Sequence, residues 1–272
     1  MPSIRAEVKE KGRNKQYKRG ATLLLRDSFP SASESDGKHV CVTEPNSNVR
    51  ERIGGEDGML FEFRASTFFQ NNNSVLPSLV EYVRASLFDF TPSVNPPPTR
   101  LLDTYCGAGL FSICLSPHFT HSSGIELSKE SIDAAKHNAY NLNGLDKDRV
   151  SFVSGDAGRI FRDVQWGVKG QEGWEQERAR TAIVIDPPRK GCSDEFLEQL
   201  MKWGAGTVVY VSCNVHTQAR DVGVLVQGGS SVAMEVEGEK RWRYKLESVR
   251  GFDLFPQTAH VESVALLRRV EE

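Results

Sequence analysis

Cys213 stands where a cysteine could act as a nucleophile. It follows the apolar run Val208–Val211, which has the composition of a buried strand, and it precedes a segment with helical spacing. The start of a helix lowers the pKa of a nearby thiol, and the thiolate is the reactive form. A thiolate here could add to an electron-poor carbon of a substrate. Position alone fits a buried structural cysteine equally well.

A proton acceptor could come from the segment Gly251–Glu262, which ends at the apolar strand Ser263–Leu267. A carboxylate placed near a reactive thiol can serve as a general base, so Glu262 is a candidate. The alternative for Glu262 is an exposed residue beside a strand. His260 fits a structural, hydrogen-bonded histidine as well as a catalytic one.

A nucleoside site is indicated by Leu101–Gly109, where an apolar strand runs into a turn containing Gly107 and Gly109. Glycines there let a ligand approach the backbone closely, and Glu126 ends the next strand, where it could accept hydrogen bonds from ribose hydroxyls. A tight connection from strand to helix explains the glycines alone. A dinucleotide would require a third glycine or alanine at position 112, where Ser112 stands, and this favours S-adenosylmethionine over a nicotinamide dinucleotide. Asp156 could contact the adenine or cap a turn.

A rigid loop, Asp186-Pro187-Pro188-Arg189, follows the apolar run Ile183–Ile185. Proline fixes φ and restricts the preceding residue, so Asp186 and Arg189 should be held in place. An aromatic residue at position 189 would suit methylation of an exocyclic amine, because the ring would stack on the base. Arginine argues against that reaction.

These groups together fit methylation at C5 of uracil. C5 is a poor nucleophile, and addition of a thiolate at C6 gives C5 carbanion character, so that C5 can attack a sulfonium methyl group. A general base must then remove the C5 proton before the thiolate can leave.

The elements that position these groups alternate between strand and helix, which predicts a doubly wound, mostly parallel sheet covered by helices on both faces. Ligands bind at the carboxyl ends of the strands in such folds. The predicted strands are Arg100–Tyr105, Ser122–Glu126, Val150–Ser154, Thr181–Asp186 and Thr207–Ser212. The predicted helices are Leu110–Ser116, Ser128–Leu142, Ser193–Trp203 and His216–Gln227, after an earlier helical pattern from Val75 to Leu87.

The remaining segments are less regular. A basic stretch over residues 1–20 has the composition of a solvated tail, and residues 21–65 predict a few antiparallel strands at Ala21–Leu25, Val40–Thr43 and Met59–Phe63. The polar insert Gly170–Arg180 is predicted to be a surface loop. The basic and aromatic stretch Lys240–Lys245 fits an RNA-stacking surface and a charged sheet edge equally.

Composition excludes several classes of protein. The chain has 272 residues, 39% of them hydrophobic, and a net charge of −2, so nucleic-acid binding would depend on local patches. Five cysteines without a CxxC pair argue against a disulfide framework and against a zinc site. No apolar run is long enough to span a membrane and no secretory signal is present, so we expect an intracellular protein. The cytoplasm, the nucleus and the mitochondrion all fit.

Taken together, the motifs resemble those of the uracil-C5 RNA methyltransferase family, in particular its transfer RNA enzymes of the fungal type. The resemblance covers about residues 20–272. The matching blocks are Phe68-Phe69-Gln70-x-Asn72, Asp103-x-Tyr105-Cys106-Gly107-x-Gly109, Asp186-Pro187-Pro188-Arg189, Ser212-Cys213-Asn214 and Asp253-Leu254-Phe255-Pro256-Gln257-Thr258-x-His260-Val261-Glu262.

The resemblance implies a Rossmann-like class I S-adenosylmethionine-dependent methyltransferase fold with a seven-stranded sheet. It also implies that Cys213 is the nucleophile, that Glu262 is the base, and that the substrate is the T-loop uridine 54 of transfer RNA. The cofactor would contact Gln70, Tyr105, Gly107, Gly109, Glu126 and Asp186. Positioning of substrate and loops would fall to Arg189, Asn214 and His260.

The chain departs from the family pattern at Val215, where proline is usual, and the family's N-terminal RNA-binding barrel is expected to be lacking. We expect a partial β domain over residues 1–66 and the catalytic domain over residues 67–272, with RNA but no obligate protein as partner. Four alternatives remain open: a ribosomal RNA uracil-C5 methyltransferase, a cytosine-C5 enzyme, a non-catalytic RNA-binding protein, and a truncated product that binds cofactor only. A cytosine-C5 enzyme would carry cysteine where Arg189 stands.

Overall fold

The structure is a computed structural model in which two compact units are formed. The larger unit holds the described residues of 51–61 and 69–272, and the smaller unit holds those of 1–50 and 62–68. Asp156 and the predicted strand Ala21–Leu25 lie outside the described residues. The described residues are 26–29, 38–41, 48–64, 67–70, 72–89, 97–155, 161, 164, 166–229 and 241–270.

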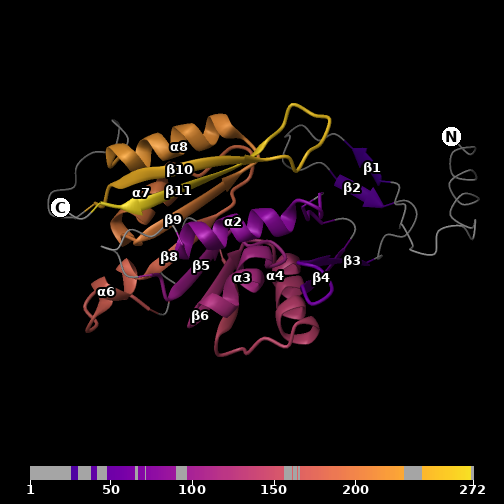
Figure 1. The fold of residues 1–272 in the computed structure, drawn as a ribbon, viewed down its shortest axis with the longest axis horizontal. Helices are drawn as coiled ribbons and strands as arrows, with labels where there is room; N and C mark the ends of the chain where they lie inside the picture. Colours follow the sequence, from indigo (N-terminus) through magenta and orange to yellow (C-terminus); the bar gives the residue numbers. More distant parts are fainter. Residues whose placement is uncertain are drawn as a thin grey trace, which may run out of the picture. The chain divides into compact units, whose positions relative to one another are not determined.

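A seven-stranded sheet runs through the larger unit in the order β10-β11-β9-β8-β5-β6-β7 (Figure 1). Strands β9, β8, β5, β6 and β7 pair in parallel, whereas β11 is antiparallel to both of its neighbours. This confirms the predicted doubly wound, mostly parallel, seven-stranded sheet. The strands are β5 (Arg100–Thr104), β6 (His121–Glu126), β7 (Val150–Ser154), β8 (Thr181–Ile185), β9 (Thr207–Ser212), β10 (Tyr244–Phe252) and β11 (Glu262–Arg269).

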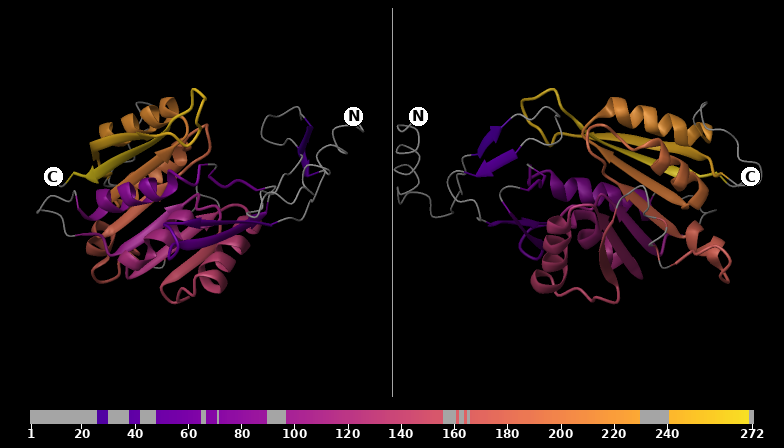
Figure 2. Two further views of the ribbon diagram at one scale, coloured as in Figure 1. Left: turned by 45° about the vertical axis from the view of Figure 1, so that its right-hand side comes forward. Right: turned by 180° about the vertical axis from the view of Figure 1, so that it is seen from behind.

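Helices cover both faces of this sheet, as the buried, β-branched sequences of β8 and β9 require. Strands β9, β10 and β11 lie between α8 on one side and α2 on the other (Figures 1 and 2). Helix α8 contacts α7, and α2 contacts α3. The helices are α2 (Leu76–Phe88), α3 (Leu110–Leu115), η1 (Ser116–His118), α4 (Lys129–Lys136), η2 (His137–Leu142), α6 (Trp174–Ala179), α7 (Asp194–Trp203) and α8 (Val215–Gln227).

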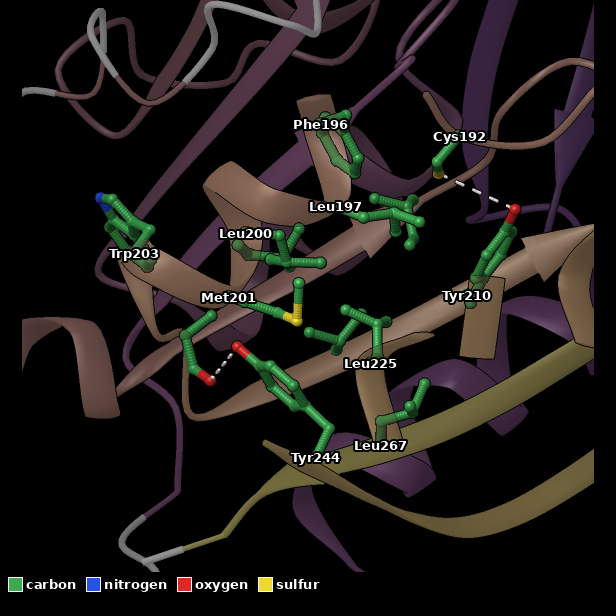
Figure 3. Close-up of a cluster of buried hydrophobic side chains, with 14 of the residues drawn as sticks. Cys192, Phe196, Leu197, Leu200, Met201, Trp203, Tyr210, Leu225, Tyr244 and Leu267 are labelled. Carbon is green, nitrogen blue, oxygen red and sulfur yellow. Dashed lines mark hydrogen bonds between the residues drawn. The ribbon is translucent and has the colours of Figure 1, made fainter. Parts of the chain in front are cut away.

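The core on the α7 and α8 side is continuous and apolar (Figure 3). Two of its members, Tyr210 and Tyr244, are almost completely buried, and each keeps its hydroxyl hydrogen-bonded. Tyr244 donates to the carbonyl of Ala205 at 3.0 Å, and Tyr210 donates to the carboxylate of Asp221 at 2.6 Å. A buried hydroxyl without a partner would cost stability, so both contacts help to specify this packing.

The described part of Lys240–Lys245 contributes to packing. Arg241 forms an ion pair with Glu198 at 2.7 Å, and the guanidinium of Arg269 lies 3.9 Å from the ring centroid of Trp242. Tyr244 is buried. These contacts favour the sheet-edge interpretation of the stretch over an RNA-stacking surface, and Lys240 lies outside the described residues.

The prediction of a surface loop over Gly170–Arg180 is wrong for residues Trp174–Ala179, which form helix α6. Contacts with residues distant in sequence hold its side chains in place, and the polar composition of the segment does not reveal these contacts. Arg178 lies over the rings of Trp174 and Trp203, and Glu177 pairs with Arg100 at 2.8 Å. Tertiary contacts therefore stabilise a helix that lacks an apolar stripe.

Two short strand pairs precede the large sheet. Strand β1 (Arg26–Phe29) pairs antiparallel with β2 (Lys38–Cys41), and β3 (Asn48–Ile53) pairs with β4 (Met59–Arg64). The predicted strands Val40–Thr43 and Met59–Phe63 overlap β2 and β4, whereas β3 was not anticipated because its sequence is mostly polar. The domain boundary expected after residue 66 stays a prediction.

Asn143 fastens the start of β4 to the end of η2. Its side-chain oxygen accepts from the amide of Leu60 at 2.8 Å, and its side-chain nitrogen donates to the Leu60 carbonyl at 2.7 Å. The same helix presents Asn138, whose side chain donates to the carbonyl of Ala108 in the glycine turn at 3.0 Å. The π-helix η2 thus holds both the glycine turn and β4.

Replacing Asn143 by alanine should loosen β4 locally, because both hydrogen bonds to Leu60 are lost. We expect the Leu60 amide to exchange with deuterium about 10-fold faster, the equivalent of about 1.4 kcal/mol. The matched control is Asn141→Ala, which removes an exposed asparagine of the same helix and should leave that exchange unchanged. Equal effects of the two substitutions would contradict this role.

Candidate active site at the carboxyl edge of the sheet

Five titratable side chains follow the order of the strands along one edge of the sheet. Parallel strands end at a common edge, and an antiparallel strand begins there, so residues distant in sequence meet. Electrostatic coupling links each charged group to a neighbour in the row. In sheet order the row is Glu262 at the start of β11, Cys213 after β9, Asp186 after β8, Asp103 in β5 and Glu126 at the end of β6.

The register of β9 and β11 brings Cys213 and Glu262 together. Ser263 pairs with Ser212, so Glu262 and Cys213 stand at the next position of the ladder. The buried side chain of Gln218 in α8 reinforces this register, because its amide donates to the carbonyls of Tyr210 at 2.8 Å and Ser263 at 3.1 Å. One amide therefore connects the two strands that carry the thiol and the carboxylate.

Glu262 has the environment of a general base. Its side chain is only 1% exposed, and neither carboxylate oxygen has a hydrogen-bond partner among the described residues. Burial raises the pKa of Glu262 to about 7. A carboxyl group with such a pKa can both accept and release a proton near neutrality. The interpretation of Glu262 as an exposed residue does not hold.

Cys213 is half-buried and lies just before the start of α8. Burial raises the pKa of its thiol, and the negative charges of Glu262 and Asp186 raise it further. A hydrogen bond and the positive charge of Arg189 oppose that shift. Arg189 is thus the group that favours the thiolate, and it comes from the rigid loop after β8.

Asp186 and Arg189 enter the site from opposite ends of the Asp-Pro-Pro-Arg loop. Burial raises the pKa of Asp186 well above its usual range, and the charges of Glu262 and Asp103 add to the effect. Asn214 holds the other end of the loop by donating to the carbonyl of Arg189 at 3.0 Å. The side chain of Asn214 also caps α8 by accepting from the amide of His216 at 3.1 Å.

The glycine turn and Glu126 form the other half of the row. Glu126 accepts from the amides of Gly107 at 3.3 Å and Ser128 at 2.9 Å, which fix its carboxylate at the end of β6. Gly107 and Gly109 have φ values of 52° and 92°, and a Cβ on Gly109 would lie 2.9 Å from Ile113. Tyr105 also has a positive φ, 61°, and packs on the ring of Phe196.

Asp103 belongs to the site although the sequence analysis gave it no role. One carboxylate oxygen accepts from the amide and hydroxyl of Ser112, at 2.8 Å and 2.6 Å, and the other is buried without a partner among the described residues. Burial raises the pKa of Asp103 to about 7, against the effect of the Ser112 hydrogen bonds. A buried free acceptor of this kind is available to a ligand.

Gln70 lies in the segment between β4 and α2. Its side-chain oxygen is buried and has no partner among the described residues, which leaves it available to a ligand. Asn72 ties this segment to the polar stretch after β10 by donating to the carbonyl of Asp253 at 2.9 Å. His260 lies exposed on that stretch, where its ring contacts Phe255. The expected positioning role of His260 stays a prediction.

Sequence reasoning also missed the buried polar residues of α8. Gln218 and Asp221 share a helix face with Val222 and Leu225, all of them buried. Polar residues at buried positions of an amphipathic helix are the signal that could have found them. Their partners could not have been named, because these come from strands and loops distant in sequence.

Comparison with known proteins settles the family. A profile described as tRNA (uracil-5-)-methyltransferase matches residues 32–270. The chain belongs to this family. It is 41% identical, over 99% of its length, to the tRNA (uracil(54)-C(5))-methyltransferase of Schizosaccharomyces pombe, and it covers 45% of that protein. The enzyme of the same name from Saccharomyces cerevisiae is 36% identical over 94% of the chain, which covers 41% of it.

The chain therefore spans less than half the length of these curated relatives. Among solved structures, the tRNA (uracil-54, C5)-methyltransferase of Pyrococcus abyssi, in complex with S-adenosyl-L-homocysteine, has 28% identity and a TM-score of 0.58 over 81% of this chain and 44% of that one. Trm5b from the same organism has a TM-score of 0.63 at 14% identity over all of this chain and 71% of that one, which shows a shared fold. The expected family and methyltransferase fold are confirmed.

No group of three or more His, Cys, Asp or Glu side chains among the described residues is arranged to hold a metal ion. No helix within the described ranges has the length and apolar character needed to cross a membrane.

Replacing Glu262 by glutamine should stabilise the protein more at high pH than at low pH. Burial raises the folded-state pKa of Glu262 from 4.5 to about 7, so wild type loses stability as the pH rises through that interval. We expect the free energy of unfolding of Glu262→Gln relative to wild type, measured by denaturant unfolding, to be greater by about 2 to 3 kcal/mol at about pH 8 than at about pH 5.

The control is Glu175→Gln, which neutralises an exposed glutamate on α6. Its stability relative to wild type should be the same at both pH values. An advantage of Glu262→Gln that does not change with pH would contradict the buried, unpaired carboxylate.

Proposed function

We propose that this chain transfers a methyl group from S-adenosylmethionine to C5 of a uracil in transfer RNA, at uridine 54. The observation that supports this most is the meeting of Cys213 and Glu262 at the edge of the sheet. A thiol and an unpaired carboxyl with a pKa near neutrality are the two groups that covalent activation of a pyrimidine needs. The names of the fungal relatives supply the uridine position.

The residues present fit S-adenosylmethionine. Glu126 lies where ribose hydroxyls can donate to it, and the buried oxygens of Gln70 and Asp103 have no partner among the described residues. The row of carboxyl groups suits a ligand with a positive charge, because a nearby cation offsets the effects of burial and of mutual repulsion that raise their pKa values. The bound cofactor supplies a methyl group made electrophilic by its sulfonium charge.

Cys213 starts the reaction by forming a bond from its sulfur to C6 of the uracil. The electron pair of the C5–C6 double bond moves toward C5 and the adjacent carbonyl. C5 then takes the methyl group, whose bond to the cofactor's sulfur would break with the electron pair remaining on that sulfur. Arg189 assists by favouring the thiolate, because its hydrogen bond and its charge oppose the rise that burial causes in the pKa of the thiol. Asn214 keeps Arg189 in place through its backbone carbonyl.

Glu262 completes the reaction by taking the proton from C5. The electron pair of the C5–H bond then restores the C5–C6 double bond, and the bond from C6 to sulfur breaks to return the Cys213 thiolate. Glu262 meets the requirements because its oxygens are not used in hydrogen bonds with described residues and its pKa is raised to about 7. A target base that is stacked in folded RNA must first be flipped out, at a cost of a few kcal/mol.

The test uses transfer RNA that contains 5-fluorouracil, mixed with this chain and S-adenosylmethionine. Fluorine at C5 cannot leave as a cation, so the base cannot be released and the bond from sulfur to C6 persists. We expect a complex that survives denaturing electrophoresis, with the crosslink on Cys213. The Cys213→Ala variant should form none.

Cys114→Ala is the matched control, because Cys114 lies on α3 and the pKa of its thiol is shifted by burial and by none of the charged groups of the row, so its loss should not affect the complex. Absence of a complex at saturating RNA and cofactor would contradict the proposal for this chain. Methylation of unmodified transfer RNA by Cys213→Ala at the wild-type rate would contradict the covalent route alone. Preferential reaction with ribosomal RNA fragments would overturn the choice of transfer RNA.

A further inference from the structure

Asp221 is a buried anion that holds a loop of the active site. Its side chain is fully buried on α8. One carboxylate oxygen accepts two hydrogen bonds, from the amide of Cys192 at 2.8 Å and from the hydroxyl of Tyr210 at 2.6 Å. Cys192 ends the loop of residues 186–192, and Tyr210 belongs to β9, so one carboxylate joins the loop, the helix and the strand.

Arg220 clamps the same loop from the solvent side. It pairs with the second carboxylate oxygen of Asp221, at 2.8 Å from Nε and 2.7 Å from Nη2. Its guanidinium also donates to the carbonyls of Lys190 at 3.1 Å and Cys192 at 3.2 Å. The adjacent residues of opposite charge thus bind both donors and acceptors of the loop backbone.

The first turns of α8 hold the loop at a second place. Thr217 donates from its hydroxyl to the carbonyl of Arg189 at 3.2 Å, and Asn214 donates to the same oxygen at 3.0 Å. Asn214, Thr217 and Asp221 are spaced by three and four residues and therefore face the same side of the helix start. The loop backbone is consequently fastened on both sides of Lys190.

The contact between loop and helix is too close for a side chain. Gly191 has a φ of 79°, and a Cβ there would lie 2.6 Å from both Arg220 Nη2 and Asp221 Oδ2. Only glycine fits this combination of backbone angle and distance. The position of the loop is therefore set by the Asp221 and Arg220 side chains themselves.

We propose that Asp221 is a positioning residue, which fixes the 186–192 loop on α8 and thereby keeps the Arg189 side chain beside the Cys213 sulfur. The role of Asp221 in catalysis rests on the proposed function, whereas the contacts that hold the loop do not depend on RNA or cofactor. Arg189 is exposed and reaches Cys213 only from this loop, whose backbone the Asp221 cluster holds. A loop released from α8 would withdraw the group that favours the thiolate.

The experiment measures the reactivity of Cys213 toward iodoacetamide as a function of pH. Modification is read by mass spectrometry on tryptic peptide 203–220, in which Cys213 is the one cysteine. Asp221→Asn removes the negative charge that pairs with Arg220. It also places an NH2 donor where an oxygen accepts either from Arg220 or from Cys192 and Tyr210. We expect the midpoint of alkylation to move up by about half a pH unit or more, which makes alkylation at neutral pH ~3-fold slower.

A second pair of variants separates positioning from general stability. Tyr210→Phe removes one hydrogen bond to Asp221, and Tyr244→Phe removes an equally buried hydroxyl that bonds Ala205 on the other side of the same core (Figure 3). Tyr210→Phe should shift the alkylation midpoint upward, and Tyr244→Phe should leave it at the wild-type value. If Asp221→Asn does not fold, this pair still decides the question. Thr217→Val adds a further test, because it removes the hydrogen bond from the Thr217 hydroxyl to the carbonyl of Arg189 and should also shift the midpoint upward.

An alkylation profile of folded Asp221→Asn or Tyr210→Phe identical to that of wild type would overturn the proposal. So would an equal shift in Tyr244→Phe, since the effect would then reflect loosening of the core. The fluorouracil complex provides a separate readout. A wild-type chain that forms that complex, together with unshifted variants, would refute positioning by Asp221 and leave the proposed function intact.

Discussion

The pairing of β11 between β9 and β10 is the constraint on which the site depends. Because β11 runs antiparallel to β9, its first residue lies at the edge where β9 ends. A parallel strand in the same place would carry Glu262 to the opposite edge, far from Cys213. The ladder from Ser263 to Arg268, together with the Gln218 amide across the two strands, keeps the base and the thiol together.

Burial of its carboxyl groups gives this edge its electrostatic character. Asp103, Asp186 and Glu262 all have raised pKa values because the sheet and its helices remove water from their carboxyl groups. Such an arrangement costs folding stability, and it is the usual condition of groups that must change protonation during a reaction. Arg189 opposes the rise in the pKa of the Cys213 thiol. The contacts with α8 that hold the Arg189 loop therefore influence the reactivity of the thiol.

Much of the fold and of the site follows from local sequence. The apolar runs before Asp103, Asp186 and Cys213 predict strands, and the carboxyl ends of parallel strands meet, so the motifs could be assigned to one edge. Strand β3 and helix α6 were not predicted because their polar side chains are fixed by partners elsewhere in the chain, Glu62 for Arg50 of β3 and Arg100 for Glu177 of α6. The burial of Glu262 could not be predicted for a similar reason, because the elements that cover its side chain are distant from it in the sequence.

The proposal that Cys213 and Glu262 act on the same uracil is tested most directly with transfer RNA that carries tritium at C5 of uridine. Wild type should release one tritium for each methyl group transferred. The Glu262→Gln variant should take up methyl groups as a covalent adduct and retain the tritium, because the thiolate addition survives and the proton acceptor is lost. Release of tritium by Glu262→Gln at the wild-type rate would show that another group removes the proton, and the account given for this edge of the sheet would be wrong.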